Sequence, residues 1–183
     1  MTNGIAEELE KLKSLNGADF VTQLKRIASR KEFHPIKRDS KILITGGEKH
    51  PDFPRLLEVA QKAVEHGYTV YILPNPDAFR TADFIFERRG VFKLFDLKTI
   101  SGKSTAENRL LESIGQTNRV LLHITSDYNP GALARSIKRY FESNGAALEV
   151  LVFKGKKSVS ITRDLILSPN YYQLFMKRLI KGE

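Results

Sequence analysis

The stretch "TADFIFERRGVFKLFDLKTIS", residues 81–101, decides the fold expected for this chain. It contains two runs rich in β-branched and aromatic residues, 82–86 and 91–100, separated by the turn sequence "ERRG". Such runs on either side of a glycine-containing turn are typical of two antiparallel strands. The pattern therefore predicts a β-hairpin from Ala82 to Ile100, and the apolar flanks indicate that its strands are largely covered.

Three charged side chains lie in this hairpin. Side chains alternate faces along a strand, so Asp96 and Lys98 point the same way. The turn places Asp83 close to opposite Asp96, within one register step. Burying an uncompensated charge is costly, and a cation would offset two neighbouring carboxylates. Because oxygen ligands suit Mg²⁺ or Mn²⁺, we expect Asp83 and Asp96 to hold a divalent metal.

A metal on two carboxylates with an adjacent ammonium favours phosphodiester hydrolysis. The metal polarises the phosphoryl oxygen and lowers the pKa of a bound water. Lys98 would stabilise the charge that develops on phosphorus, or orient or deprotonate the water. The competing interpretation is a salt-bridge cluster on an exposed face of the sheet.

The elements around the hairpin predict a mixed α/β fold with a central sheet flanked by helices. A short helical N-terminal arm, residues 1–40, is expected to end in the connector "FHPIKRDS", and the main domain is expected to span residues 41–183. Apolar periodicity predicts helices at 52–67, 104–116, 129–145 and 171–181, and strands at 41–45, 68–74, 119–125, 147–153 and 158–162.

Composition narrows the possible classes. The chain has 183 residues and no cysteine, which excludes disulfides, thiolate zinc sites and a cysteine nucleophile. No apolar run of about 18 residues predicts a membrane helix, and the first residues lack a secretory-signal layout. We expect action in a cytoplasm without membrane binding.

The net charge of +9 favours a polyanionic partner, above all nucleic acid. Lys154, Lys156 and Lys157 in the "KGKK" turn are candidate contacts to the phosphate backbone, as are Lys103 and Arg109. Solvated surface charge is the alternative for all of them.

The hairpin also resembles a known signature. Asp83 and the "DLK" of residues 96–98, with twelve residues between them, resemble the PD-(D/E)xK nuclease motif. The order of elements from Pro54 to Thr125 resembles the αβββαβ restriction-endonuclease-like core of that superfamily. The segments "YILPNP", "TADFIF", "FDLKT" and "NRLLESIGQTNRVLLHI" are most similar to the C-terminal nuclease domains of contact-dependent growth inhibition toxins and related mobile-element proteins.

This resemblance implies a metal-dependent nuclease with RNA, and tRNA first, as substrate. The superfamily often adds a glutamate from the first core helix, for which Glu58 is the candidate and Glu65 the reserve. Thr99 and Gln116 resemble helper positions. Ala82 departs from the proline that commonly precedes the first aspartate.

Three alternatives stay open. The first is a DNA endonuclease of the same superfamily, acting in repair, restriction or element mobility. The second is a non-catalytic module that binds nucleic acid. The third is a scaffold whose residues 1–40 bind a protein partner. No base-recognition motif separates RNA from DNA, and the cleavage position, preferred metal and oligomeric state are not specified by the sequence.

Overall fold

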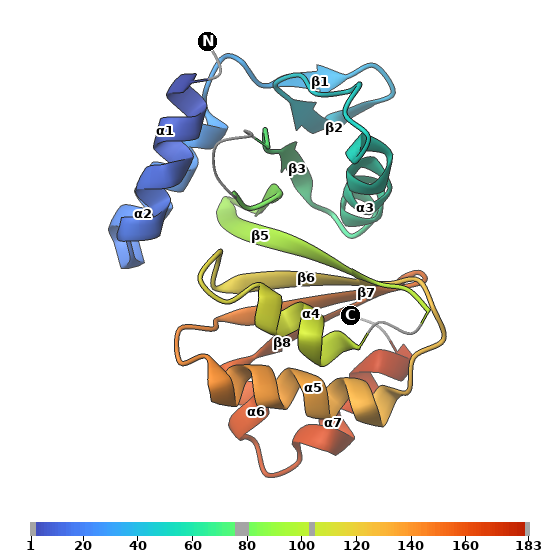
Figure 1. The fold of residues 1–183 in the computed structure, drawn as a ribbon. Coiled ribbons are helices and arrows are strands. Elements are labelled where there is room, and N and C mark those ends of the chain that lie inside the picture. Colours follow the sequence, from blue (N-terminus) through green and yellow to red (C-terminus); the bar gives the residue numbers. More distant parts are fainter. Residues whose placement is uncertain (1–2, 76–80, 103–104, 182–183) are drawn as a thin grey trace. The chain divides into compact units, whose positions relative to one another are not determined.

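The computed structural model describes residues 3–75, 81–102 and 105–181. The chain forms two compact units, Met1–Phe95 and Asp96–Glu183, called unit 1 and unit 2 below. Figure 1 shows the elements of both units, which are described separately. The boundary falls within strand β5, Val91–Ile100. Its first half pairs with β4 in unit 1, and its second half pairs with β6 in unit 2.

The described residues of unit 1 form a mixed sheet and four helical segments. The helices are α1 (Asn3–Lys11), the 3₁₀ helix η1 (Leu12–Ser14), α2 (Gly17–Ala28) and α3 (Phe53–Glu65). The strands are β1 (His34–Ile36), β2 (Asp39–Ile44), β3 (Thr69–Ile72), β4 (Phe84–Arg88) and the first half of β5. Strands β2 and β3 are parallel, whereas β1–β2, β3–β4 and β4–β5 are antiparallel.

The expected hairpin is confirmed. Strands β4 and β5 pair antiparallel with Phe84 opposite Phe95. Arg89 (φ 53°) and Gly90 (φ 79°) form the turn, and both adopt the left-handed backbone that a tight hairpin of this type requires.

The helices of unit 1 share a core with the hairpin. Leu24 and Ile27 of α2 belong to the same buried cluster as Ile85 of β4 and Leu94 of β5. Helix α3 packs on β2 and β3. The hairpin is therefore covered by apolar side chains from the first 28 residues of the chain.

The connector expected at residues 33–40 is corrected by the structure, because it contains β1 and the start of β2. The polar composition of "HPIKRDS" hides a strand that forms only through antiparallel pairing with β2. Proline is tolerated at Pro35 because β1 is an edge strand. A separate arm ending at residue 40 stays a prediction.

Unit 2 contains three parallel strands followed by an antiparallel one. Its strands are the second half of β5, β6 (Arg119–Ile124), β7 (Glu149–Lys154) and β8 (Lys157–Thr162). Its helices are α4 (Ala106–Glu112), α5 (Pro130–Ser143), α6 (Arg163–Leu167) and α7 (Tyr171–Lys181). The short helix α6 was not expected from the sequence.

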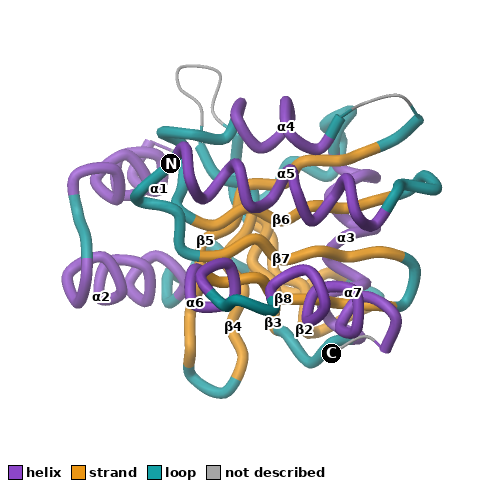
Figure 2. Tube along the Cα trace, turned by 90° about the horizontal axis from the view of Figure 1, so that it is seen from below, coloured by secondary structure: helices purple, strands orange, loops and turns teal. Residues whose placement is uncertain are grey.

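Helices α4 to α7 cover one face of the unit 2 strands (Figures 1 and 2). Ile100 of β5 belongs to the buried cluster that these helices form with β6, β7 and β8. Because side chains alternate along a strand, Asp96 and Lys98 point to the same helix-covered face as Ile100.

The mixed α/β class is confirmed, and the order α3, β3, β4, β5, α4, β6 is the one expected from the sequence. Within the described parts of the chain, no helix is long and apolar enough to cross a membrane.

Candidate functional site

The Asp96–Lys98 pair lies on β5 in unit 2 and is almost completely buried. Asp96 is 3% exposed and Lys98 is 7% exposed. Lys98 Nζ lies 3.1 Å from Asp96 Oδ2, which defines an ion pair. The strand β6 residues opposite them are Val120 and Leu122, so the pair is placed beside an apolar core. The exposed salt-bridge cluster is therefore not what these two residues form.

Asp96 Oδ2 nevertheless accepts no hydrogen bond from the described residues. Its contact with Lys98 has the distance of an ion pair but not the angles of a hydrogen bond. Among the described residues, this buried oxygen has no hydrogen-bond partner. An unsatisfied buried polar group costs about 1–3 kcal/mol, and more when it is charged. A cation or a water molecule at this oxygen would remove that cost.

Tyr140 of α5 is a buried polar side chain of unit 2 that the sequence did not single out. It is 1% exposed, and its hydroxyl accepts a hydrogen bond from Asn144 Nδ2 at 3.4 Å. Burial raises the pKa of the Tyr140 hydroxyl, and the nearby negative charge of Asp96 adds to that rise. In the sequence, Tyr140 reads as one more core aromatic beside Ile137 and Phe141. Only its hydroxyl group, which phenylalanine lacks, could have indicated a polar role.

The two helper candidates lie in different surroundings. Thr99 follows Lys98 on β5, so its side chain points to the opposite face of the strand from Asp96 and Lys98. Gln116 lies in the turn after α4, and its Nε2 donates to Glu112 O at 3.0 Å. Thr99 Oγ1 and Gln116 Oε1 are buried atoms without a hydrogen-bond partner in the part of the chain that is described.

Asp83 lies in unit 1, directly before β4. Its N–H donates to Phe95 O at 3.0 Å, and its carbonyl accepts from the Leu73 N–H at 2.9 Å. These bonds fix the main chain of Asp83 beside the residue that precedes Asp96. The Asp83 side chain is half-buried.

Asp83 also lines a cavity of about 360 Å³ within unit 1. The cavity lies where the parallel strands β2 and β3 end and α3 begins. Asp52 supplies a second carboxylate there, and Gly46 and Gly47 line it after β2. Both glycines have positive φ, so the "TGG" turn could not keep this path with ordinary side chains.

Asp96 offers a carboxylate oxygen, the ligand type that a hard divalent cation prefers, and Oδ2 has no hydrogen-bond donor among the described residues. Lys98 Nζ lies 3.1 Å from the same oxygen. Within the described residues, no group of three or more His, Cys, Asp or Glu side chains could hold a metal.

The remaining candidates are spread over both units. Glu58 is exposed on α3 and is not among the residues that line the Asp83 cavity. Glu65 is exposed near the end of α3. Arg109 forms an exposed ion pair with Glu112 at 3.4 Å. Lys103 lies outside the described residues.

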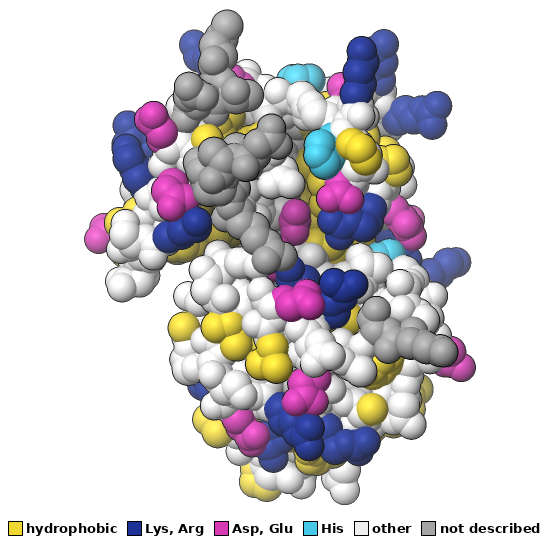
Figure 3. Space-filling view, in the orientation of Figure 1, with side chains coloured by type: hydrophobic (Ala, Val, Ile, Leu, Met, Phe, Trp, Pro, Cys, Tyr) yellow, Lys and Arg dark blue, Asp and Glu magenta, His cyan; other side chains and the backbone are white. Residues whose placement is uncertain are grey.

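The lysines Lys154, Lys156 and Lys157 line a second pocket, which lies within unit 2. Elsewhere, on the face shown in Figure 3, Lys and Arg side chains are interspersed with Asp and Glu. The excess positive charge is therefore not gathered into a single large patch on that face.

No family model matches this chain, and no curated protein matches it. A solved structure described as the CdiA-CT/CdiI toxin and immunity complex from Burkholderia pseudomallei is similar, with 17% sequence identity and a TM-score of 0.42. The match covers 61% of this chain and 84% of that chain. A likeness of this strength does not extend to activity, which has to be argued from the residues themselves.

Proposed function

We propose that this chain is a metal-dependent nuclease that hydrolyses phosphodiester bonds. The observation that carries the proposal is the buried Asp96–Lys98 ion pair, whose Oδ2 has no hydrogen-bond partner among the described residues. A structural ion pair would be expected to satisfy its carboxylate with further donors. A catalytic site, in contrast, benefits from a carboxylate oxygen that is left without a hydrogen-bond donor and can bind a cation.

In this proposal, Asp96 and Asp83 are the carboxylate ligands of Mg²⁺ or Mn²⁺. Asp83 is proposed as the second ligand on the strength of the sequence pattern described above. Glu58 is kept as a third candidate, acting through a metal-bound water. When bound, the metal would supply Lewis acidity and an activated water.

Lys98 has the electrostatic role. Its ammonium is held at 3.1 Å from Asp96 and is almost excluded from solvent. Charges interact more strongly in such surroundings than in water. The ammonium would stabilise the negative charge that develops on the phosphoryl group, or orient the attacking water. Gln116 remains a helper candidate through its unpaired buried Oε1, whereas the Thr99 side chain points to the opposite face of β5 from Lys98.

RNA, and tRNA first, is the proposed substrate, on the strength of the sequence resemblance described above. The net charge of +9 supports a polyanionic substrate but does not separate RNA from DNA. A DNA endonuclease of the same superfamily is the alternative. Such an enzyme would act in a cytoplasm, after export if it is a toxin domain, and the exposed side chains of residues 1–40 would be available to a protein partner.

The test is cleavage of tRNA, single-stranded DNA, duplex DNA and a branched junction with Mg²⁺, Mn²⁺ or EDTA. Asp96→Asn keeps the shape of the side chain but removes its charge, so cleavage should fall by about 100-fold or more, as expected when a group that stabilises the transition state is lost. Asp164→Asn, which changes an exposed aspartate of α6 in the same unit, is the matched control and should cleave normally.

The substrate that is cut decides between RNA and DNA. Cleavage that persists in EDTA, or that Asp96→Asn leaves unchanged, would contradict the proposed site. Binding of nucleic acid without cleavage under any metal would instead identify a non-catalytic module.

A further inference from the structure

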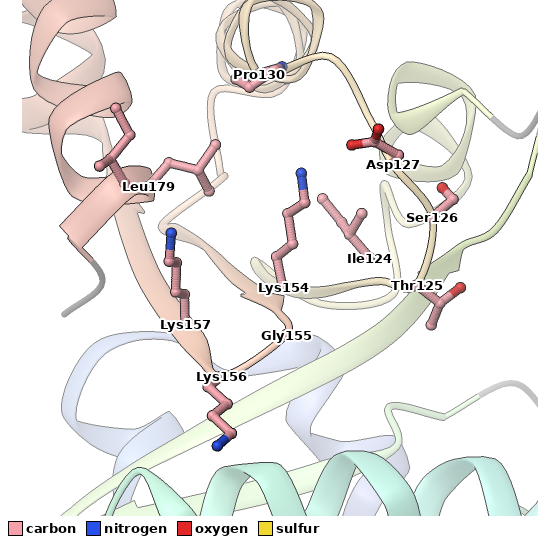
Figure 4. Close-up of a pocket in the computed structure, with 11 residues that line it drawn as sticks. Ile124, Thr125, Ser126, Asp127, Pro130, Lys154, Gly155, Lys156, Lys157 and Leu179 are labelled. Atoms are coloured by element: carbon pink, nitrogen blue, oxygen red, sulfur yellow. The ribbon is translucent and has the colours of Figure 1, made fainter.

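A pocket of about 580 Å³ opens in unit 2 where the parallel strands β6 and β7 end (Figure 4). Three segments form it: the loop after β6, the turn between β7 and β8, and the last turn of α7. Pro130, the first residue of α5, closes one side. The carboxyl edge of parallel strands is a frequent location of ligand sites in α/β proteins.

The pocket carries an excess of positive charge. Lys154, Lys156 and Lys157 line it, and Asp127 is the single acidic residue among the lining residues that are described. In Figure 4, Lys154 extends into the space between Ile124 and Leu179, whereas Lys156 points away from it. Lys154 Nζ donates to Tyr128 O at 3.5 Å, so two of its three ammonium protons remain for a ligand.

One further feature favours an anion in this pocket. Helix α5 has 14 residues and begins at the pocket with its N-terminal end, where the helix dipole favours negative charge. The N-cap residue Asn129 already satisfies one N–H group of this helix end, because its Oδ1 accepts a hydrogen bond from the Ala132 N–H at 2.9 Å.

The opposite wall of the pocket is apolar. Leu179 and Ile180 of α7 form it together with Ile124, and Ile180 is 67% exposed. An apolar wall facing a cationic rim suits a ligand that has both a flat apolar group and a phosphate. The volume lies within the range of about 300–1,000 Å³ that is usual for small-molecule sites.

We propose that this pocket binds a nucleotide, with its phosphate on Lys154 and Lys157 and its base against Leu179 and Ile180. The nucleotide is either a free mononucleotide or one unit of a nucleic-acid strand, and in the second case the inference rests on the proposed nuclease function. The pocket is separate from Asp96. That residue pairs with Val120, four residues before Ile124 on β6, which is about 13 Å along a strand.

The test measures the binding of fluorescent AMP and of a labelled single-stranded RNA oligonucleotide in EDTA, so that cleavage and metal binding cannot contribute. In Lys154→Gln/Lys157→Gln, affinity should fall about tenfold or more, as expected for the loss of two charged contacts. Lys177→Gln, which removes an exposed charge of α7 outside the pocket, is the matched control and should bind normally. Ile180→Asp, at an exposed position, should weaken binding without unfolding the chain.

Loss of AMP binding in the double variant would assign the pocket to free nucleotides, and loss of oligonucleotide binding alone would assign it to a strand. The proposal is overturned if the wild type binds neither probe, or if the double variant binds both as tightly as Lys177→Gln does. If the wild type binds either probe but never cleaves nucleic acid under any metal, the nuclease proposal is refuted and the pocket proposal stands.

Discussion

At the residue scale, the decisive feature is a charged pair that a strand places inside an apolar core. Asp96 and Lys98 are two residues apart, so both face the helices of unit 2. The burial of each charge is tolerated because the opposite charge of its partner offsets part of the desolvation cost. The carboxylate is still short of one hydrogen bond within the described residues, which is the property that a metal ligand needs.

Removing only one partner of this pair should destabilise the protein strongly. Lys98→Met leaves the Asp96 carboxylate buried without its counter-charge, and we expect a loss of about 3–5 kcal/mol in the free energy of unfolding. The double variant Asp96→Leu/Lys98→Met should lose much less, because both charges are replaced by apolar groups. Urea denaturation measures the difference. A single variant as stable as the double variant would show that the pair does not depend on mutual charge.

At the scale of elements, the β4–β5 hairpin determines where the site residues can be. Its register sets Phe84 opposite Phe95, and the following residues of β5 then pair with β6. The turn is held by Gly90, whose N–H donates to Glu87 Oε1 at 2.7 Å.

Gly90→Ala should therefore destabilise the chain through its backbone alone. A Cβ at Gly90 would meet no atom within 4 Å, but its φ of 79° is strained for any residue with a side chain. We expect a cost of about 1–2 kcal/mol. Gly145→Ala is the control, since that glycine also has open space but no positive φ. Equal urea midpoints for the two variants would argue against backbone strain at the turn.

At the scale of the whole molecule, the first residues of the chain are part of the core of unit 1. Leu24 and Ile27 of α2 are fully buried with Ile85 of the hairpin. An arm that was independent of the main domain would not share a buried cluster with it. The expected boundary at residue 40 can therefore be examined directly by truncation.

Deletion of residues 1–32 should expose the apolar face of β4 and β5, with Ile85 and Leu94, to solvent. We expect the truncated chain to aggregate or to lose most of its resistance to urea, because large buried apolar side chains contribute about 1.5–3 kcal/mol each. Size-exclusion chromatography and urea denaturation measure the effect. A soluble truncated chain with an unchanged midpoint would establish residues 1–40 as a separate arm.

Local pattern was sufficient to predict the hairpin, most helices and the shared face of Asp96 and Lys98. These depend on periodicities of 2 and 3.6 residues, which are visible in any short window of sequence. The same local information places Asp83 at the start of the hairpin.

Tertiary structure alone decided the rest. Strand β1 forms because β2 is available to pair with it, and Tyr140 becomes buried only when α5 packs on the strands of unit 2. The pocket at Lys154 joins segments that are up to 56 residues apart, from Ile124 to Ile180. Such contacts depend on which segments pack against one another. The periodicity of a single segment does not contain that information.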